Sequence, residues 1–312
     1  MSLLPNLKFP MNEIFENREL FACAAGIFLA AAAVGLFSAR RSGGNGAGRA
    51  RRFAELFLAA AAWTLLSCAL GERGSRGGHL PVSNIFEIFQ ALGWCAVFSA
   101  VFLRAVWALR VPVFFATGTA GLLCALGFAN VRGWDILPVS ADAFTGTPWI
   151  GVHAAFATIG YACFSAAAMV WWIFLLQNSA LRKRRTHRFF SRLPDLSTLD
   201  RISTRLCSAG LVFFGVGVAV GVAALAGNFT LSSTLAVYKT GLSVLIFFGF
   251  AGVRILRGQN KISALKFARA GTAIFVAAIV LLGGMACLRD DNGAHPAAII
   301  SHGEKTGSEV AK

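Results

Sequence analysis

Residues 147–185 read TPWIGVHAAFATIGYACFSAAAMVWWIFLLQNSALRKRR, and this stretch decides the fold class. From Trp149 to Gln177 it is almost entirely apolar, and as a helix this segment would be roughly 43 Å long at about 1.5 Å per residue. A helix needs roughly 20 apolar residues to cross a hydrocarbon core of about 30 Å. The stretch therefore predicts a membrane-spanning helix, with His153 near its start and a block of cations at its end.

The rest of the chain repeats this pattern. Hydrophobic residues make up 56% of the 312 residues and charged residues only 14%, which excludes a water-soluble globular protein. Helices satisfy their own backbone hydrogen bonds in lipid, so the sequence predicts an all-α, polytopic integral membrane protein with about eight transmembrane helices. The apolar runs lie near 20–38, 53–70, 85–103, 111–129, 149–177, 206–226, 233–252 and 267–287.

The distribution of cations predicts the orientation. Most of the 29 Lys and Arg residues fall in the loops after the first, third, fifth and seventh runs. The positive-inside rule places these loops in the cytoplasm and both termini outside. The net charge of +15 is then a signal of topology and of lipid headgroups, and no nucleic-acid partner is expected. No cleavable signal precedes the first run, so we expect that helix to be retained.

The pattern divides the chain into four segments. They are an outer N-terminal segment at 1–19, two transmembrane helices with a basic Gly-rich loop at 20–84, a membrane domain at 85–287 and a polar tail at 288–312. We expect a flexible link at 40–52, outer loops at 71–84 and 131–149, and the main cytoplasmic loop at 181–201. The seven cysteines lie in or beside apolar runs without a CxxC pair, and we interpret them as small hydrophobic residues.

His153 has two interpretations. His153, Ala157 and Gly160 share one face of their helix, and the small residues leave room for a neighbouring helix or for a flat ligand. In the first interpretation Ala157 and Gly160 make a helix contact while His153 bonds to a loop. In the second, His153 is an axial ligand to a haem iron. On this topology His79 and His295 are also outside, and either is a candidate for a second ligand.

Other residues have both structural and functional interpretations. Asn84 and Glu87 open the run at 85–103, either as a helix cap with an acidic first turn or as part of an outer vestibule. Gly217 and Gly221 form a G-x-x-x-G pattern, which predicts close helix packing. We interpret Trp171 and Trp172 as lipid or interface anchors.

The chain shows no nucleophile–base pair, paired carboxylates or phosphate loop, so no catalytic site is predicted.

Three motifs resemble the cytochrome c assembly family of membrane proteins (CcsA, CcmC and HemX-like). Residues 149–167, WIGVHAAFATIGYACFSAA, are similar to the signature helix of the family. Residues 81–94, PVSNIFEIFQALGW, resemble its P-x-x-N-x-x-E stretch. Residues 193–222, LPDLSTLDRISTRLCSAGLVFFGVGVAVGV, are similar to a family helix that has a Leu-Asp pair near its start and spaced glycines farther along. The matching positions are Trp149, His153, Gly160, Tyr161, Ala162, Phe164, Asn84, Glu87, Leu199, Asp200, Arg205, Gly210, Gly217 and Gly221.

The chain also departs from the family pattern. Family members that handle haem carry a tryptophan-rich outer segment (WWD) after the glycine helix. The corresponding residues here, 226–241, read AGNFTLSSTLAVYKTG and contain neither Trp nor Asp. A histidine that the family carries one helix later is replaced by Arg254. The resemblance therefore identifies a divergent member that lacks the tryptophan-rich segment.

The resemblance implies a haem-handling membrane component of c-type cytochrome biogenesis in the bacterial inner membrane. Such a protein binds haem b non-covalently and presents it at the outer face, without a catalytic site of its own. His153 would be one axial ligand to the haem iron and His295 or His79 the other, beside a vestibule of Asn84, Glu87 and Trp149. The implied partners are membrane lipid, a cytochrome c biogenesis partner protein and apocytochrome c.

Two alternatives remain open. The first is a non-catalytic, HemX-like scaffold or regulator of haem synthesis. The missing tryptophan-rich segment favours it, and the basic residues 181–205 would be its docking surface. The second is a small-solute transporter, although no broken pair of helices is visible in the sequence.

Overall fold

The computed structural model describes residues 11–40, 45–77, 80–82, 85–109, 111–129, 148–183, 194–227 and 234–287. These ranges contain eight α-helices and no strand, so the all-α prediction is confirmed, and each predicted apolar run coincides with one helix. The helices are α1 (Met11–Arg40), α2 (Asn45–Gly77), α3 (Ile85–Trp107), α4 (Val113–Ala129), α6 (Pro148–Arg182), α7 (Leu196–Gly227), α8 (Thr234–Gly258) and α9 (Ala264–Cys287).

Seven of these helices are long and apolar enough to cross a membrane. The exception is α4, which has 17 residues and is apolar throughout. At about 1.5 Å per residue it is roughly 26 Å long, slightly less than the hydrocarbon core of about 30 Å. The chain is therefore a multi-pass membrane protein.

Two helices, α2 and α7, include residues that the sequence analysis assigns to loops. α2 begins at Asn45 and continues to Gly77, so the loops predicted at 40–52 and 71–84 are too long. The added turns are rich in Arg and Gly, residues that a hydropathy window rejects although a helix end in the headgroup region accepts them. α7 begins at Leu196, inside the predicted loop at 181–201. Asp195 caps this helix, because its carboxylate accepts hydrogen bonds from the Ser197 hydroxyl and the Thr198 N–H.

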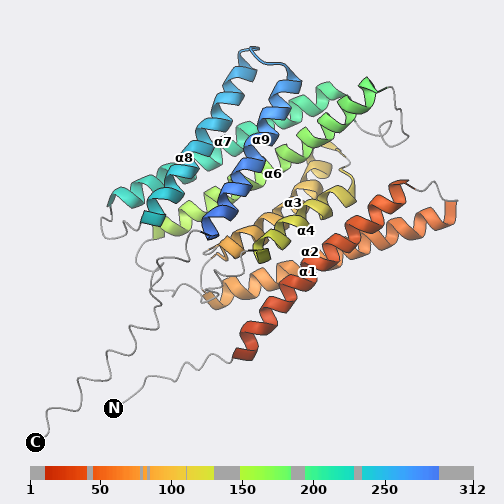
Figure 1. Cartoon of the computed structure of the whole chain (residues 1–312), viewed down its shortest axis with the longest axis horizontal. Coiled ribbons are helices and arrows are strands. Elements are labelled where there is room, and N and C mark those ends of the chain that lie inside the picture. Colours follow the sequence, from red (N-terminus) through yellow and green to blue (C-terminus); the bar gives the residue numbers. More distant parts are fainter. Residues whose placement is uncertain are drawn as a thin grey trace, which may run out of the picture.

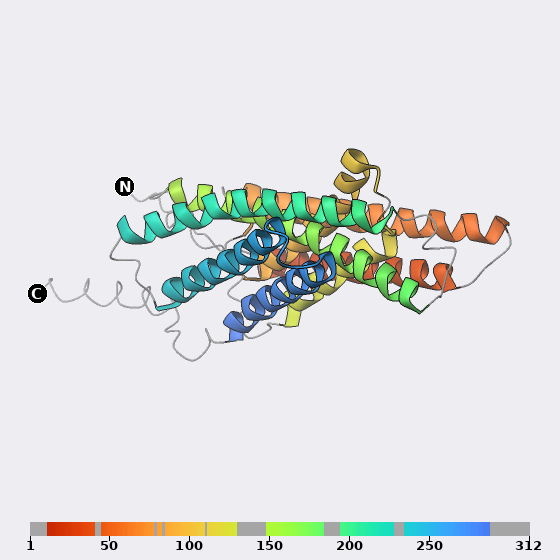
Figure 2. The same ribbon diagram turned by 90° about the horizontal axis from the view of Figure 1, so that it is seen from above.

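The helices form two groups of four. α1 to α4 contact one another, α6 to α9 contact one another, and α3 joins the groups by packing against α6 and α9 (Figures 1 and 2). α6 and α7 make the most extensive contact in the structure. α1 begins and α9 ends at the same end of the bundle, while the α8–α9 turn lies at the opposite end (Figure 1).

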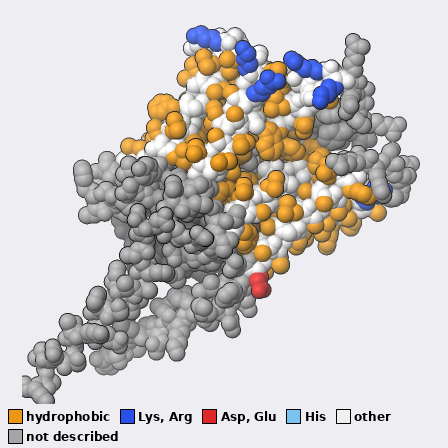
Figure 3. All heavy atoms as spheres, in the orientation of Figure 1, with side chains coloured by type: hydrophobic (Ala, Val, Ile, Leu, Met, Phe, Trp, Pro, Cys, Tyr) orange, Lys and Arg blue, Asp and Glu red, His pale blue; other side chains and the backbone are white. Residues whose placement is uncertain are grey.

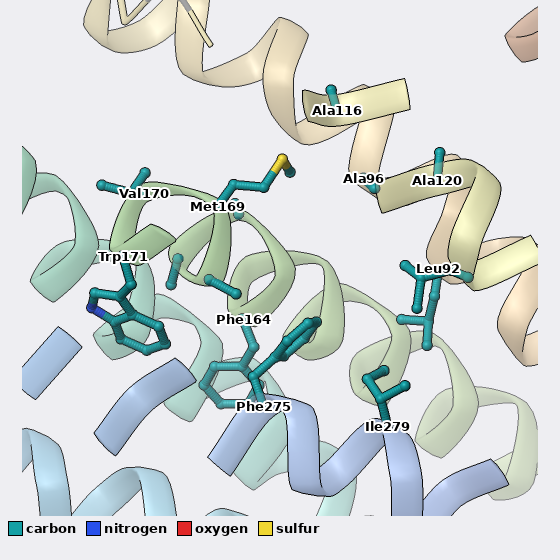
Figure 4. Close-up of a cluster of buried hydrophobic side chains, with 14 of the residues drawn as sticks. Leu92, Ala96, Ala116, Ala120, Phe164, Met169, Val170, Trp171, Phe275 and Ile279 are labelled. Atoms are coloured by element: carbon teal, nitrogen blue, oxygen red, sulfur yellow. The ribbon is translucent and has the colours of Figure 1, made fainter. Parts of the chain in front are cut away.

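Trp171 of α6 belongs to the core. Figure 4 shows it in a cluster of buried side chains that come from α3, α4, α6 and α9. Its ring is 1% exposed, stacks on Phe250 and meets Phe267 edge-on. The prediction that Trp171 anchors the protein in lipid is therefore wrong. Trp172 is partly exposed and contacts Phe115 of α4.

The outer surface matches a membrane setting. Figure 3 shows hydrophobic side chains over the middle of the visible face and Lys and Arg side chains gathered at one end. That end carries the α8–α9 turn, with Lys261 and Lys266. Large apolar side chains such as Val212 and Phe248, each 65% exposed, cover the helices between the ends. Lipid rather than water suits such a surface.

Candidate functional site

The ring of His153 lies against α7. Its Nδ1 atom is 2.6 Å from the carbonyl oxygen of Gly217. A carbonyl oxygen only accepts hydrogen bonds, so Nδ1 carries the proton and donates it. In the neutral ring the lone pair is then on Nε2, and no hydrogen-bond partner occupies Nε2 within the described ranges. A histidine that binds a metal is commonly held in this way, with its other nitrogen donating to a backbone carbonyl.

Glycines bring α6 and α7 into backbone contact. A Cβ atom added at Gly160 would lie 2.6 Å from the Cβ atom of Phe214 and 2.8 Å from its backbone nitrogen. One added at Gly217 would lie 2.9 Å from the nitrogen of Ala157, and one at Gly221 would lie 2.7 Å from Nδ1 of His153. The predicted packing role of Gly217 and Gly221 is thereby confirmed.

The α6–α7 contact covers the helix face that His153 shares with Ala157 and Gly160. The face formed by Ala157 and Gly160 is filled by α7, at Gly217 and Phe214. The interpretation of that face as room for a flat ligand is therefore wrong. The hydrogen bond of His153 goes to a helix carbonyl rather than to a loop. Because the Gly217 carbonyl engages Nδ1, a ligand would have to bind the imidazole through Nε2.

The donor set fits one axial position on a haem iron. A neutral imidazole with its proton fixed on Nδ1 presents Nε2, the nitrogen that haem iron takes from histidine. No group of three or more His, Cys, Asp or Glu side chains that could hold a metal ion occurs within the described ranges. The predicted second ligands, His79 and His295, lie outside the described residues, as does Asn84.

Glu87 has a partner that the sequence did not reveal. It lies in the first turn of α3, is 4% exposed, and its Oε1 atom is 3.3 Å from Nε of Arg73 in α2. The guanidinium of Arg73 also lies 5.7 Å from the ring centre of Phe21 and 5.4 Å from that of Phe86. Cation–π contacts of this kind stabilise a cation away from water. The pair fastens α1, α2 and α3 together at the end of the bundle where α3 begins.

Glu87 and His153 pack against different helices. Glu87 contacts α2, whereas His153 contacts α7, so the two side chains belong to different helix interfaces. Trp149, in the first turn of α6, is 62% exposed, which suits a residue at the membrane–water interface.

A cavity of about 570 Å³ lies beside α2 and does not include His153. Trp94 of α3 lines it; its indole N–H donates to the Ser67 hydroxyl, 2.8 Å away, and its ring stacks on Trp63. The other lining residues are Ser67, Leu70, Gly71, Gly74, Ser75, Leu80 and Pro81. Pro81 opens the motif at 81–94, so the cavity belongs to that region of the chain.

At the opposite end, other motif residues have a structural role. Asp200 of α7 accepts two hydrogen bonds from Arg257 of α8, at 3.3 Å from Nε and 2.5 Å from Nη2. Arg257 also donates to the carbonyl of Ile262, 3.2 Å away, which fixes the α8–α9 turn. Arg254 of α8 donates through Nε to the Ser208 hydroxyl of α7, 2.7 Å away. These contacts join α7 to α8.

Comparison with known proteins extends these observations. CcsA, the "Cytochrome c biogenesis protein CcsA" of Prochlorococcus marinus (strain NATL1A), is 24% identical over 207 residues, which are 58% of this chain and 64% of the relative. "Protein HemX" of Bacillus subtilis (strain 168) is 24% identical over 171 residues, 53% of this chain and 59% of the relative. The chain thus spans less than two thirds of either relative.

The name of a third relative states no function. It is the "Uncharacterized 28.8 kDa protein in nifR3-like 5'region" of Azospirillum brasilense, 29% identical over 148 residues, 47% of this chain and 54% of the relative. No solved structure shows a significant match. The family described as "Cytochrome C assembly protein" matches residues 82–286, from just before α3 to the end of α9 and thus more than half of the chain. The chain therefore belongs to the cytochrome c assembly protein family.

Proposed function

We propose that this protein is a component of c-type cytochrome biogenesis that binds haem b non-covalently and presents it at the non-cytoplasmic face of a bacterial inner membrane. Family membership supports the biogenesis role. The observation that carries the haem proposal is the 2.6 Å hydrogen bond between Nδ1 of His153 and the Gly217 carbonyl. It leaves Nε2 as the ligand nitrogen and holds the ring in one orientation.

The orientation of the protein supports the same assignment. Lys261 and Lys266 lie at the end of the bundle with the α8–α9 turn, and the positive-inside rule makes this the cytoplasmic end. α6 ends at the exposed Arg182 and is followed by the exposed Lys183. His153, five residues after the first residue of α6, therefore lies toward the opposite, outer face. The start of α1 and the end of α9 would then lie at the outer face (Figure 1).

The residues divide the work between binding and positioning. His153 would bind the iron, with His295 or His79 as the second ligand, and Gly217 would hold the proton on Nδ1. Haem supplies a redox-active iron and reactive vinyl groups to the cytochrome that receives it. The chain itself binds and orients this cargo for a biogenesis partner protein and apocytochrome c, a task that needs no nucleophile or general base.

An absorption spectrum of the purified full chain tests this proposal. Protein expressed with added haem precursor should show a Soret band, and His153→Ala should lose it. Thr158→Ala is a matched control on the same helix, because among the described residues the Thr158 hydroxyl bonds only to the Ala154 carbonyl of α6. A colourless wild-type protein, or a Soret band unchanged in His153→Ala, would contradict the haem proposal.

A second candidate is a non-catalytic scaffold or regulator of haem synthesis, like the HemX branch of the family. The absence of Trp and Asp from residues 226–241 favours it. Its docking surface would include the exposed cations Arg182, Lys183, Arg201 and Arg205. A pull-down with these four residues changed to Gln should lose partners that the wild-type protein captures. Unchanged partners would remove this candidate.

A further inference from the structure

One face of α7 carries cations at its start and apolar side chains farther along. Arg201, Arg205, Val212 and Val216 are all exposed. Their separations of four, seven and four residues place them in one row along the helix. Gly210, Gly217 and Gly221 lie on another side of α7, against α6. The row therefore faces outward, toward lipid.

α8 lines the same row. Arg254 donates to Ser208, which lies one turn of α7 beyond Arg205. Farther along α7, a Cβ atom on Gly215 would lie 2.9 Å from the ring of Phe247. The two helices therefore also contact each other beside the apolar part of the row. Phe248, the next residue of α8, is 65% exposed. We call the surface formed by Arg201, Arg205, Arg254, Val212, Val216 and Phe248 the α7–α8 seam.

The positive charge of the seam is not neutralised by the described part of the protein. The nearby carboxylate, Asp200, is engaged by Arg257 through both of its oxygens. Neither Arg201 nor Arg205 has a carboxylate partner among the described residues. Arginine forms strong, directional hydrogen bonds with phosphate oxygens, so two exposed guanidiniums beside Arg254 favour a phosphate group.

We propose that the α7–α8 seam binds one anionic phospholipid. The phosphate contacts Arg201, Arg205 and Arg254, and the acyl chains lie along Val212, Val216 and Phe248. An anionic lipid is favoured because it has a negative headgroup at one end and hydrocarbon along the rest, the same order as the side chains of the seam. A zwitterionic lipid carries a compensating cation in its headgroup, and free phosphate would leave the apolar part of the row without a ligand.

Thermal unfolding of the full chain in detergent tests the proposal. Phosphatidylglycerol should raise the melting temperature progressively once its concentration exceeds the dissociation constant, whereas phosphatidylcholine and inorganic phosphate should not raise it. The variant Arg201→Gln/Arg205→Gln should need about 30-fold more phosphatidylglycerol for the same shift, since each cation near a headgroup contributes about a factor of five. Both side chains are exposed, so the variant should fold.

The matched control is Lys261→Gln/Lys266→Gln. It removes the same charge from the same end of the bundle, from exposed residues outside the seam. Its response to phosphatidylglycerol should equal that of the wild type. Three results would overturn the proposal: an equal shift with phosphatidylcholine, a shift with phosphate alone, or equal losses in the two double variants. The last result would mean that only the general positive charge of this end attracts lipid.

Discussion

Nδ1 of His153 in α6 donates a hydrogen bond to the carbonyl oxygen of Gly217 in α7, and the two atoms are 2.6 Å apart. One helix therefore determines which ring nitrogen of a residue on another helix carries the proton. The two helices can approach this closely because Gly160, Gly217 and Gly221 have no side chain at the contact. Packing and the candidate ligand are thus consequences of the same three glycines.

Gly221→Ala should disturb His153 directly. The added Cβ atom would lie 2.7 Å from Nδ1 and 2.8 Å from Cε1, so the ring has to rotate or α7 has to shift. We expect a weaker Soret band from the haem-loaded protein and a lower melting temperature. Gly252→Ala on α8 is the control, because no atom lies within 4 Å of its added Cβ. Equal behaviour of the two variants would contradict the placement of the ring.

Gly160→Ala should destabilise the protein with or without haem. Its Cβ would meet backbone atoms of Phe214 at 2.8 and 2.9 Å, and backbone cannot rotate away as a flexible side chain can. Overpacking of this kind costs about 1–3 kcal/mol. An SDS unfolding titration in mixed micelles measures the loss. Gly151→Ala, on the same helix with no atom within 4 Å, should leave the unfolding free energy nearly unchanged. If both variants unfold alike, the close α6–α7 contact is absent.

Arg73 and Glu87 should behave as a coupled pair. Their side chains are only 14% and 5% exposed, so removing one partner leaves the other charge buried. Arg73→Met or Glu87→Met alone should cost about 3–5 kcal/mol of unfolding free energy, and the double variant should recover much of that loss. The double-mutant cycle is measured in the same SDS titration. Additive losses would show that the two groups do not interact.

Trp171 and Trp172 should differ sharply although they are neighbours. Trp171 packs between α8 and α9 with its ring against Phe250 and Phe267, and Trp171→Ala should cost about 3–5 kcal/mol. Trp172→Ala should cost less, because the Trp172 ring is partly exposed and leaves a smaller cavity. A lipid-soluble quencher should reduce the fluorescence of Trp172 more than that of Trp171. The reverse order of stability or quenching would contradict this packing.

The sequence predicts the helices well because the membrane imposes a simple length rule. Each of the eight predicted apolar runs lies in a helix, and the G-x-x-x-G pattern correctly predicted a close helix contact on α7. Helix ends were harder to predict. The residues at 45–52 and 71–77 are polar and Gly-rich, and only the structure shows that α2 continues through them.

Side-chain partners could not be derived in the same way. α6 is apolar on every side, so no periodicity separates buried Trp171 from partly exposed Trp172. Arg73 lay in a presumed loop, and nothing in the sequence tied it to Glu87, which begins a different helix. Likewise the small residues below His153 indicated close contact but could not tell a helix from a flat ligand. Contacts between distant parts of the chain settle such questions.

We propose that Nε2 of His153, the nitrogen that the Gly217 carbonyl leaves free, is a ligand to the haem iron. Resonance Raman spectroscopy of the full chain, expressed with added haem precursor, tests this by comparing wild type, His153→Ala and Thr158→Ala. We predict axial-histidine signatures in the wild type and in Thr158→Ala, and their loss together with the Soret band in His153→Ala. Identical haem spectra in all three proteins would show that His153 does not bind the iron.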